Sequence, residues 1–420
     1  MNIPLLLTLV TELFRQATER SHLPADEVVQ HYFQHKRFLG KRDRKEISGI
    51  FWHAIRHKSR FEWDSSGILS PSIKAGIPVE ELVVRAYRDL YPISSTPDFR
   101  KEDGISRAWN ITDKKPVREG IPDHAFYSLP EWMWVRLEQF FDRETLRDTA
   151  ASLLKPAELH LRVNTLKASV EDVIRTCTEF KIHKGKILPE ALRFQRKTDI
   201  RHHITYRRGG VEIQDEGSQL ITRIIQPQAG DCIIDACAGA GGKSLHLAAL
   251  THNRARIIAT DKYPERLMEL MIRASRADAQ IQVMDQKEVF KRLQGMADIL
   301  FLDVPCSGSG TFRRRPDLKW NLTPESIQRY VDLQRKILKE NIPLLKPGGR
   351  LVYATCSILP EENEEQMEFI MKTWPQLKPV SIPDTVRNLN IPIKPVDTPW
   401  LRIKPQDFDT DGYFVGIFEF

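Results

Sequence analysis

Two cysteines stand out in the sequence because each one closes a short apolar run and is followed by turn residues. Cys306 ends the segment Ile299–Cys306, and Cys356 ends the segment Arg350–Cys356. A short apolar run bounded by turn residues predicts a buried strand. Both thiols are therefore expected at the carboxyl ends of strands, the edge at which open α/β sheets bind ligands. Two cysteines at one edge, beside a glycine-rich loop, indicate thiol chemistry on a bound substrate.

The glycine-rich loop lies in the segment Ile233–Ser244, which predicts a strand, a tight turn and the start of a helix. Such a turn lets a ligand approach the backbone, and the helix start offers unpaired N–H groups. Three classes of ligand compete for this loop. A nucleoside triphosphate loop needs a glycine at the position of Cys237, and a dinucleotide fingerprint needs a third glycine at Ser244. Both patterns are incomplete, and the third class is S-adenosylmethionine.

Acidic residues in the first three strands of this region favour S-adenosylmethionine. Asp235 lies in the first strand, Asp261 closes the second and Asp285 closes the third. Asp261 could accept from the ribose hydroxyls, and Asp285 from the adenine amino group. Each aspartate alone could equally be a helix N-cap, but the three together favour the cofactor. The residues expected to hold it are Cys237, Ala238, Gly239, Ala240, Gly241, Gly242, Lys243, Asp261, Asp285 and Asp303.

Strands and helices alternate from Gly210 onward, which is typical of a doubly wound, mostly parallel α/β sheet. The expected strands are Cys232–Ala236, Arg256–Thr260, Ile281–Met284, Ile299–Val304 and Leu351–Ala354, with a closing pair at Leu401–Lys404 and Gly412–Phe420. The expected helices between them are Ser244–Leu250, Pro264–Ala277 and Pro324–Leu345. This order predicts an α/β catalytic domain.

The N-terminal part of the chain has helical apolar spacing from Ile3 to about Tyr91. Its block Arg20–Arg60 is rich in lysine and arginine, with aromatic residues between the charges. This composition favours a helical module that binds RNA phosphates. The alternative is a helical bundle whose charges are merely solvated. We expect the aromatic residues to form a core and the basic face to bind RNA.

A segment rich in proline, serine, aspartate and lysine, residues 92–122, is expected to be a linker. Helical spacing resumes at Tyr127–Leu154, and strands at His160–Thr165 and Ala191–Arg196 are expected to flank a helix at Val170–Phe180. We therefore expect three parts in the chain, a helical domain with its linker, a small α+β RNA-binding module and a catalytic domain, at residues 1–125, 126–209 and 210–420.

The composition restricts the partners and the compartment. The 420 residues carry a formal net charge of +7, with a pI near 9.0, which favours a polyanion such as nucleic acid. The five cysteines have no spacing typical of a zinc site, so we expect no metal. Their odd number points to reduced thiols in the cytoplasm. No apolar run approaches the ~20 residues that span a bilayer. The first residues predict a helix and not a signal peptide. We expect a monomer without a membrane partner.

Several motifs together resemble the RNA 5-methylcytosine methyltransferases of the Sun/RsmB type. They are Asp235–Lys243, Asp303–Gly308, Ala354–Ser357, Gly210–Leu220, Arg313–Trp320, Leu161–Lys167 and Thr410–Phe414. The resemblance covers roughly residues 155–420, and the N-terminal region resembles the NusB-type RNA-binding domain less closely. One departure is in the cofactor loop, which has Gly-Ala-Gly-Gly-Lys where the family usually has Ala-Pro-Gly-Gly-Lys. The resemblance implies a class I methyltransferase fold, Rossmann-like, with S-adenosylmethionine as cofactor.

The resemblance also implies a covalent mechanism. A cysteine thiolate adds to C6 of cytosine, C5 then takes the methyl group, and Asp303 hydrogen-bonds the N3 edge of the base. The spacing leaves open which cysteine attacks. The Pro-Cys nucleophile of DNA cytosine-C5 enzymes would nominate Cys306, whereas the RNA family uses the Thr-Cys cysteine. The resemblance to the RNA family therefore implies Cys356 as nucleophile and Cys306 for product release.

The expected activity is methylation of C5 of a cytosine in RNA, with 16S ribosomal RNA as the substrate. One alternative is a tRNA methyltransferase of the same family, and another is a non-catalytic RNA-binding factor for ribosome assembly. Lys243 is expected to contact either the cofactor or the RNA base. Arg313, Arg314 and Arg315 are expected to contact RNA phosphates, and the alternative for them is a solvated loop.

Overall fold

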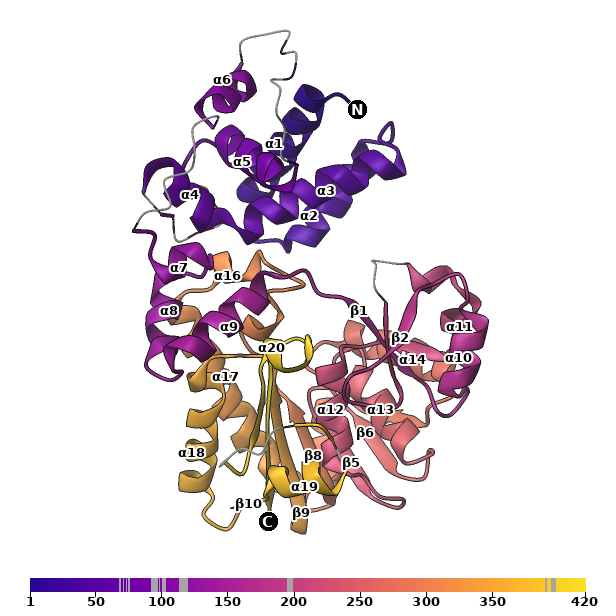
Figure 1. Cartoon of the computed structure of the whole chain (residues 1–420). Helices are drawn as coiled ribbons and strands as arrows, with labels where there is room; N and C mark the ends of the chain where they lie inside the picture. The colour runs from indigo at the N-terminus through magenta and orange to yellow at the C-terminus, as the bar shows by residue number, and fades with distance from the viewer. Residues whose placement is uncertain are drawn as a thin grey trace. The chain divides into compact units, whose positions relative to one another are not determined.

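The structure is a computed structural model, which describes residues 1–67, 69, 70, 72, 74, 76–91, 97, 99, 103–112, 120–194, 199–389, 391–393 and 398–420. Two compact units make up the chain (Figure 1). The first unit is Met1–Lys155 together with Phe312–Thr323, and the second is Pro156–Thr311 together with Pro324–Phe420. These units do not coincide with the three expected ranges. Among the described residues, no helix combines the length and the apolar character that crossing a membrane requires.

The first unit is helical in its described residues, as the apolar spacing predicted. Its helices are α1 (Ile3–Glu19), α2 (Ala25–His35), α3 (Lys41–Arg56), α4 (Lys58–Ser66), α5 (Val79–Leu90), α6 (Gly104–Ile111), α7 (Asp123–Phe126), α8 (Glu131–Glu138), α9 (Arg143–Leu154) and α16 (Leu318–Asn321). Helix α1 packs on α3 and α5, and the rings of Phe14 and Phe51 meet edge to face with centroids 5.9 Å apart. Tyr32, Phe33 and Phe51 of the basic block are buried, which confirms that most of its aromatic residues form the core, whereas Phe38 is exposed. Part of the expected linker lies outside the described residues, but helix α6 lies within its range, packs on α5 and buries Trp109, so this part is not a linker.

The segment Phe312–Thr323 belongs to the first unit although the residues on either side of it belong to the second. Trp320 Nε1 donates to the carbonyl oxygen of Ile55 at 2.9 Å, and Lys319 Nζ donates to that of Arg56 at 2.8 Å. Both side chains are buried. The sequence assigned this segment to the catalytic domain, because local spacing does not show which distant residues a segment contacts.

The second unit contains the expected mostly parallel sheet, with strand order β10-β12-β9-β8-β5-β6-β7 and β11 paired with β12 (Figure 1). Its strands are β5 (Cys232–Asp235), β6 (Arg256–Ala259), β7 (Ile281–Val283), β8 (Ala297–Asp303), β9 (Leu345–Thr355), β10 (Lys378–Pro379), β11 (Leu401–Ile403) and β12 (Tyr413–Glu419). The five strands from β5 to β9 are parallel, whereas β12 pairs antiparallel with β9. The order reverses between β5 and β8, and ligands bind at such a switch point in open α/β sheets. This arrangement confirms the class I methyltransferase fold.

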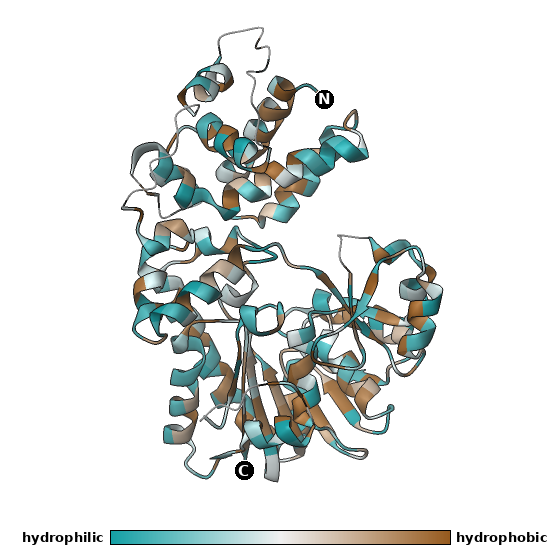
Figure 2. Cartoon of the chain, in the orientation of Figure 1, coloured by the Kyte–Doolittle hydropathy of each residue, from teal (hydrophilic) through white to brown (hydrophobic). Residues whose placement is uncertain are grey.

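Helices cover both faces of this sheet. They are α12 (Glu216–Ile225), α13 (Gly242–Leu250), α14 (Pro264–Ala277), α15 (Gln286–Arg292), α17 (Pro324–Asn341), α18 (Glu364–Thr373), α19 (Ile382–Asn388) and α20 (Pro405–Phe408). Successive strand residues such as Ile233 and Ile234 enter separate apolar cores on opposite faces. Both faces of the central strands are therefore apolar, which accounts for the continuous apolar runs in the sequence, and Figure 2 shows these strands in brown. Helix α17 ends before its expected end, and a 3₁₀ turn, Ile342–Leu344, follows with Pro343 inside it.

A smaller antiparallel sheet, in the order β2-β3-β1-β4, precedes the large one in the second unit. Its strands are β1 (Leu159–Val163), β2 (Ile182–Lys184), β3 (Ala191–Phe194) and β4 (Val211–Ile213), accompanied by α10 (Val170–Thr176) and α11 (Ile204–Arg207). Two of these strands fall in the segments where the sequence predicted strands. The last two residues of the expected strand at Ala191–Arg196 lie outside the described residues.

Candidate active site

The two cysteines meet at the carboxyl edge of the large sheet. Strands β8 and β9 are neighbours, and their register places Asp303 beside Ala354. The loops that follow these strands bring Cys306 Sγ to 3.3 Å from Cys356 Sγ. A disulfide bond is about 2.05 Å long, so these are two free thiols in contact. The structure therefore brings together the pair that the sequence placed at one edge.

Backbone contacts fix the two loops against each other. Gly310 N–H donates to the carbonyl oxygen of Cys356 at 2.9 Å, and Gly412 N–H donates to that of Gly310 at 2.8 Å. A Cβ atom on Gly310 would lie 2.2 Å from the Gly412 oxygen and 2.9 Å from the Cys356 oxygen. Only glycine fits at position 310, because any side chain would push the two thiol loops apart.

Lys243, the second residue of α13, forms an ion pair with Asp303. Its Nζ lies 2.5 Å from Asp303 Oδ2, and the lysine side chain is only 14% exposed. Burial alone would lower the pKa of Lys243, but the Asp303 carboxylate outweighs it and raises that pKa, with a further contribution from Cys356. Lys243 is therefore a fixed cation whose charge acts on both Asp303 and the Cys356 sulfur.

The environment of Cys306 keeps its proton in place. Its hydrogen bond with Cys356 and its burial raise the pKa of the Cys306 thiol well above the usual range. The charge of Glu362 acts in the same direction. At neutral pH Cys306 is therefore a protonated thiol in contact with the Cys356 sulfur.

The cofactor loop has open space and a buried acid beside it. Gly239 and Gly241 have positive φ angles of 52° and 84°, and nothing lies within 4 Å of a Cβ added at Gly239. Asp235 is 1% exposed, and burial raises its pKa to about 7. Ser244 Oγ donates to Asp235 Oδ2 at 2.5 Å, while Asp235 Oδ1 has no hydrogen-bond partner among the described residues.

Asp261 connects this loop to the end of β6. Its Oδ2 accepts from Gly239 N–H at 2.8 Å, and its Oδ1 accepts from Tyr263 N–H at 2.9 Å. Each carboxylate oxygen retains capacity for one more hydrogen bond. The open glycine turn, the unpartnered oxygen of Asp235 and the position of Asp261 fit the binding of S-adenosylmethionine.

Arg162 of β1 supports the cofactor loop, and sequence reasoning did not single it out. Its Nη1 donates to the carbonyl oxygen of Gly242 at 2.8 Å and also to the side chain of Gln214. Arg162 is 1% exposed, and burial lowers its pKa to about 10. An arginine between the apolar residues Leu161 and Val163 of a strand is the signal that could have identified it, since such a residue is seldom buried without a partner.

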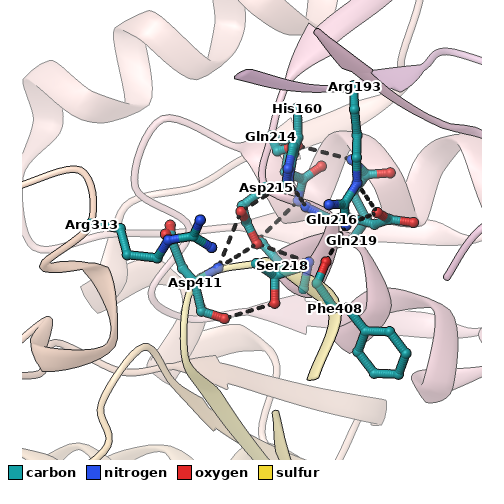
Figure 3. Close-up of polar contacts among 12 residues, drawn as sticks. His160, Arg193, Gln214, Asp215, Glu216, Ser218, Gln219, Arg313, Phe408 and Asp411 are labelled. Atoms are coloured by element: carbon teal, nitrogen blue, oxygen red, sulfur yellow. Dashed lines mark hydrogen bonds and ion pairs between the residues drawn. The ribbon is translucent and has the colours of Figure 1, made fainter. Parts of the chain in front are cut away.

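A buried polar network anchors the start of α12 in the same unit (Figure 3). Glu216 is fully buried and accepts hydrogen bonds from the backbone of Ile187 and Leu188 at 2.6 and 2.9 Å and from Arg193. Glu216 N–H in turn donates to His160 Nδ1 at 3.1 Å. The network ties the small sheet to α12, and this accounts for the polar residues of the Gly210–Leu220 motif.

The remaining expected site residues are Asp285 and the arginines 313–315. Asp285 is exposed and caps α15, with its Oδ1 accepting from Lys287 N–H at 2.8 Å, so its expected contact with adenine stays a prediction. Arg313 lies in the first unit and is 2% exposed, so it is not available to a phosphate. Arg314 is exposed and Arg315 half-buried. Within the described residues, no group of three or more His, Cys, Asp or Glu side chains could hold a metal ion.

Comparisons of the sequence with known proteins all indicate the same family. A model described as 16S rRNA methyltransferase RsmB/F matches residues 222–419, and a model of the RsmF/B-like ferredoxin-like domain matches residues 129–201. A probable ribosomal RNA small subunit methyltransferase B of Bacillus subtilis (strain 168) is 30% identical over 415 residues, covering 90% of each chain. A protein of the same description from Synechocystis sp. is 32% identical over 314 residues, covering 73% of this chain and 69% of its own.

Solved structures share the fold. The crystal structure of PH0851 aligns over 100% of both chains with a TM-score of 0.78 and 23% identity. A methyltransferase homologue from Pyrococcus horikoshii aligns over 71% of this chain and 97% of its own, with a TM-score of 0.59 and 26% identity. The resemblance seen in the motifs is thus confirmed. The chain belongs to the RsmB/F family of 16S rRNA methyltransferases, whose methyl donor is S-adenosylmethionine.

Proposed function

We propose that this protein methylates C5 of a cytosine in 16S ribosomal RNA through a covalent bond between Cys356 and C6 of the base. The observation that carries the proposal is the 3.3 Å contact between the two sulfur atoms at the switch-point edge of the sheet. Two thiols at this edge match the two roles that the family resemblance implies, one thiol to attack the base and one to assist release. The descriptions of the B. subtilis and Synechocystis relatives support the small-subunit RNA as substrate.

The reaction begins with the Cys356 thiolate, which forms a bond to C6 and converts the ring to an enamine nucleophilic at C5. S-adenosylmethionine supplies the methyl group as an electrophile. C5 takes the methyl group, a base removes the C5 proton, the C5–C6 double bond forms again and the S–C6 bond breaks. The target base must first leave its stack, which costs a few kcal/mol unless it is already unpaired.

The charges at the site support the assignment of the two thiols. The Lys243 cation interacts electrostatically with Cys356, the thiol proposed to attack as an anion. Cys306 keeps its proton, and an S–H group in contact with Cys356 stabilises the thiolate that leaves in the last step. Cys356 is therefore the nucleophile and Cys306 the residue for release.

Asp303 is proposed to bind the target base, and Lys243 holds Asp303 in position. One carboxylate oxygen of Asp303 is held by Lys243, and the side chain remains 31% exposed. The other oxygen is then oriented to bind the N3 edge of cytosine, where positive charge develops in the adduct. The glycine turn from Cys237 to Gly242, with Asp261, is proposed to hold the cofactor.

The test uses purified protein, methyl-labelled S-adenosylmethionine and total RNA from cells that lack this gene, with the Cys356→Ser variant as blank. The RNA is separated by size and digested to nucleosides. Label in 5-methylcytidine from small-subunit ribosomal RNA is the expected result. Label in 5-methylcytidine from the tRNA fraction would support the same reaction with tRNA as the substrate. Label in another nucleoside, or none while the cofactor still binds, would overturn the proposal.

A further inference from the structure

Two adjacent residues, Glu362 and Asn363, lie behind the thiol pair at the junction between the 3₁₀ turn Pro360–Glu362 and helix α18. Both side chains are fully buried. The sequence around them, Pro-Glu-Glu-Asn-Glu-Glu, is rich in charge and would ordinarily be exposed to solvent. Their burial therefore requires partners, and the partners are the two thiol loops.

Glu362 holds the loop that carries Cys306. Its Oε1 accepts from Ser307 N–H at 2.8 Å, and its Oε2 accepts from Ser307 Oγ at 2.5 Å. Gln334 Nε2 donates both to Glu362 Oε1 at 3.1 Å and to the carbonyl oxygen of Pro305 at 3.0 Å. Both neighbours of Cys306 in the chain are thus tied to one carboxylate, directly or through Gln334.

Asn363 holds the loop that carries Cys356 in the same way. Its Oδ1 accepts from Thr355 Oγ1 at 2.6 Å, and its Nδ2 donates to the carbonyl oxygen of Ser357 at 2.9 Å. Both neighbours of Cys356 in the chain are therefore tied to one amide. The two sets of contacts meet at Ser357, whose side chain also hydrogen-bonds to Glu362.

Glu362 and Asn363 are adjacent in the chain, so their side chains anchor both thiol loops to nearly the same point of the backbone. A serine cluster joins the loops as well, with Ser309 Oγ and Ser357 Oγ 3.0 Å apart. Burial of a carboxyl group is costly unless hydrogen bonds compensate it. Burial raises the pKa of Glu362, while its hydrogen bonds from Ser307, Ser357 and Gln334 act in the opposite direction.

We propose that Glu362 and Asn363 form a clamp that positions the thiol pair, with Glu362 placing Cys306 and Asn363 placing Cys356. The proposal rests on the function proposed above, because it assigns each residue to one chemical step. Loss of the Glu362 contacts releases the Cys306 loop and impairs release of the product. Loss of the Asn363 contacts releases the Cys356 loop and impairs formation of the covalent bond. Neither residue touches the substrate, so both are positioning residues.

The first test needs neither RNA nor cofactor. The full chain is treated with iodoacetamide, and the alkylation rates of Cys306 and Cys356 are followed separately by mass spectrometry of their peptides. Glu362→Ala should raise the rate at Cys306 relative to Cys356 by about tenfold, as expected for the loss of buried hydrogen bonds worth ~1.4 kcal/mol. Asn363→Ala should raise the rate at Cys356 relative to Cys306 by a similar factor. An unchanged ratio in both variants would overturn the clamp.

A matched control is Gln366→Ala. Gln366 is also fully buried, and its Nε2 donates to the carbonyl oxygen of Glu361 at 2.7 Å, so it supports the same turn without contacting either thiol loop. Its loss should lower the thermal midpoint and leave the ratio of alkylation rates unchanged. If an alanine variant fails to fold, Glu362→Gln and Asn363→Asp keep part of the hydrogen bonding and should shift the ratio in the same directions by smaller factors.

The second test is a single turnover with RNA and S-adenosylmethionine. Glu362→Gln should accumulate a covalent protein–RNA adduct, as Cys306→Ser should, whereas Asn363→Asp should form the adduct more slowly. If Cys306→Ser accumulates adduct but the two clamp variants behave alike, the clamp is wrong. If even Cys306→Ser gives no adduct, the proposed function is wrong, and the alkylation ratios still decide whether the clamp exists.

Discussion

Cys306 Sγ lies 3.3 Å from Cys356 Sγ, although 50 residues separate the two cysteines in the chain. The parallel pairing of β8 with β9 produces this contact, because both strands end at the same edge and both are followed by short loops. The contact makes the thiols chemically unequal. Cys306 keeps its proton, whereas the charge of Lys243 acts on Cys356.

The inequality of the thiols predicts different outcomes for two conservative variants. Cys356→Ser should lower turnover at least about 1,000-fold, because a serine hydroxyl is a poor nucleophile at neutral pH. Cys306→Ser should form the bond to C6 but fail to release it, so that a protein–RNA adduct accumulates and is seen as a shifted band on a denaturing gel. Cys232→Ser, at the start of β5, should behave as the unchanged chain. If the first two variants behaved the other way round, Cys306 would be the nucleophile and Cys356 the residue for release.

Asp235 predicts a pH dependence of stability. Burial raises its pKa from 3.8 to about 7, so the folded chain keeps a proton that the unfolded chain has released. Its contribution to the free energy of unfolding is therefore fully present below about pH 4. It falls by on the order of 4 kcal/mol as the pH rises to about 7. In Asp235→Asn the amide carries no such proton, and the dependence should disappear.

Urea unfolding at pH 5 and at pH 7.5, without cofactor, measures this difference. The urea midpoint of the unchanged chain should fall, relative to that of Asp235→Asn, between the lower and the higher pH. Parallel pH dependence of the two midpoints would show that Asp235 is ionised in the folded chain at both values.

The strands that carry the site could be predicted from the sequence, because their apolar runs are continuous and end at turn residues. The expected strand Cys232–Ala236 and the observed β5 differ by one residue. Strand β9 was less predictable, since it begins at Leu345 and runs through Pro-Gly-Gly, residues that predict a turn. A register irregularity in its pairing with β8, between Ala297 and Ile299, accommodates this stretch.

The partners of buried polar residues could not be predicted in the same way. Glu362 and Asn363 lie in a run of charges that predicts an exposed segment, and only the hydroxyl and backbone groups of two distant loops make their burial possible. Lys319 is buried because Arg56, 263 residues earlier in the chain, offers a carbonyl oxygen. Local spacing records which residues are apolar, but it does not record which distant groups will satisfy a polar one.

Adjacent arginines in the Arg313–Trp320 motif should respond differently to mutation. Arg314 is exposed, so Arg314→Ala should weaken RNA binding and reduce the slope of log affinity against log salt by about 1. Arg313 is buried, so Arg313→Ala should instead lower the free energy of unfolding by ~1–3 kcal/mol. Filter binding at several salt concentrations and urea unfolding separate the two effects. An altered salt slope in Arg313→Ala, with stability unchanged, would contradict this distinction.

Gly310→Ala tests whether turnover depends on the close approach of the thiol loops. An added Cβ would lie 2.2 Å from the Gly412 oxygen, so the backbone must move, at a cost of ~1–3 kcal/mol of stability. Because Gly310 N–H also binds the Cys356 oxygen, the movement displaces the nucleophile, and turnover should fall about 100-fold. Binding of S-adenosylmethionine, measured by calorimetry, should stay intact, since Gly310 does not belong to the cofactor loop.

The matched control for this variant is Gly49→Ala in the middle of α3, where nothing lies within 4 Å of an added Cβ. It should raise stability by ~0.5–1 kcal/mol, because alanine is the better helix former, and leave turnover unchanged. If Gly310→Ala also kept full turnover, the separation of the two sulfur atoms would not limit the reaction. Catalysis would then depend on Cys356 and the Lys243–Asp303 pair, without a requirement for contact between the thiols.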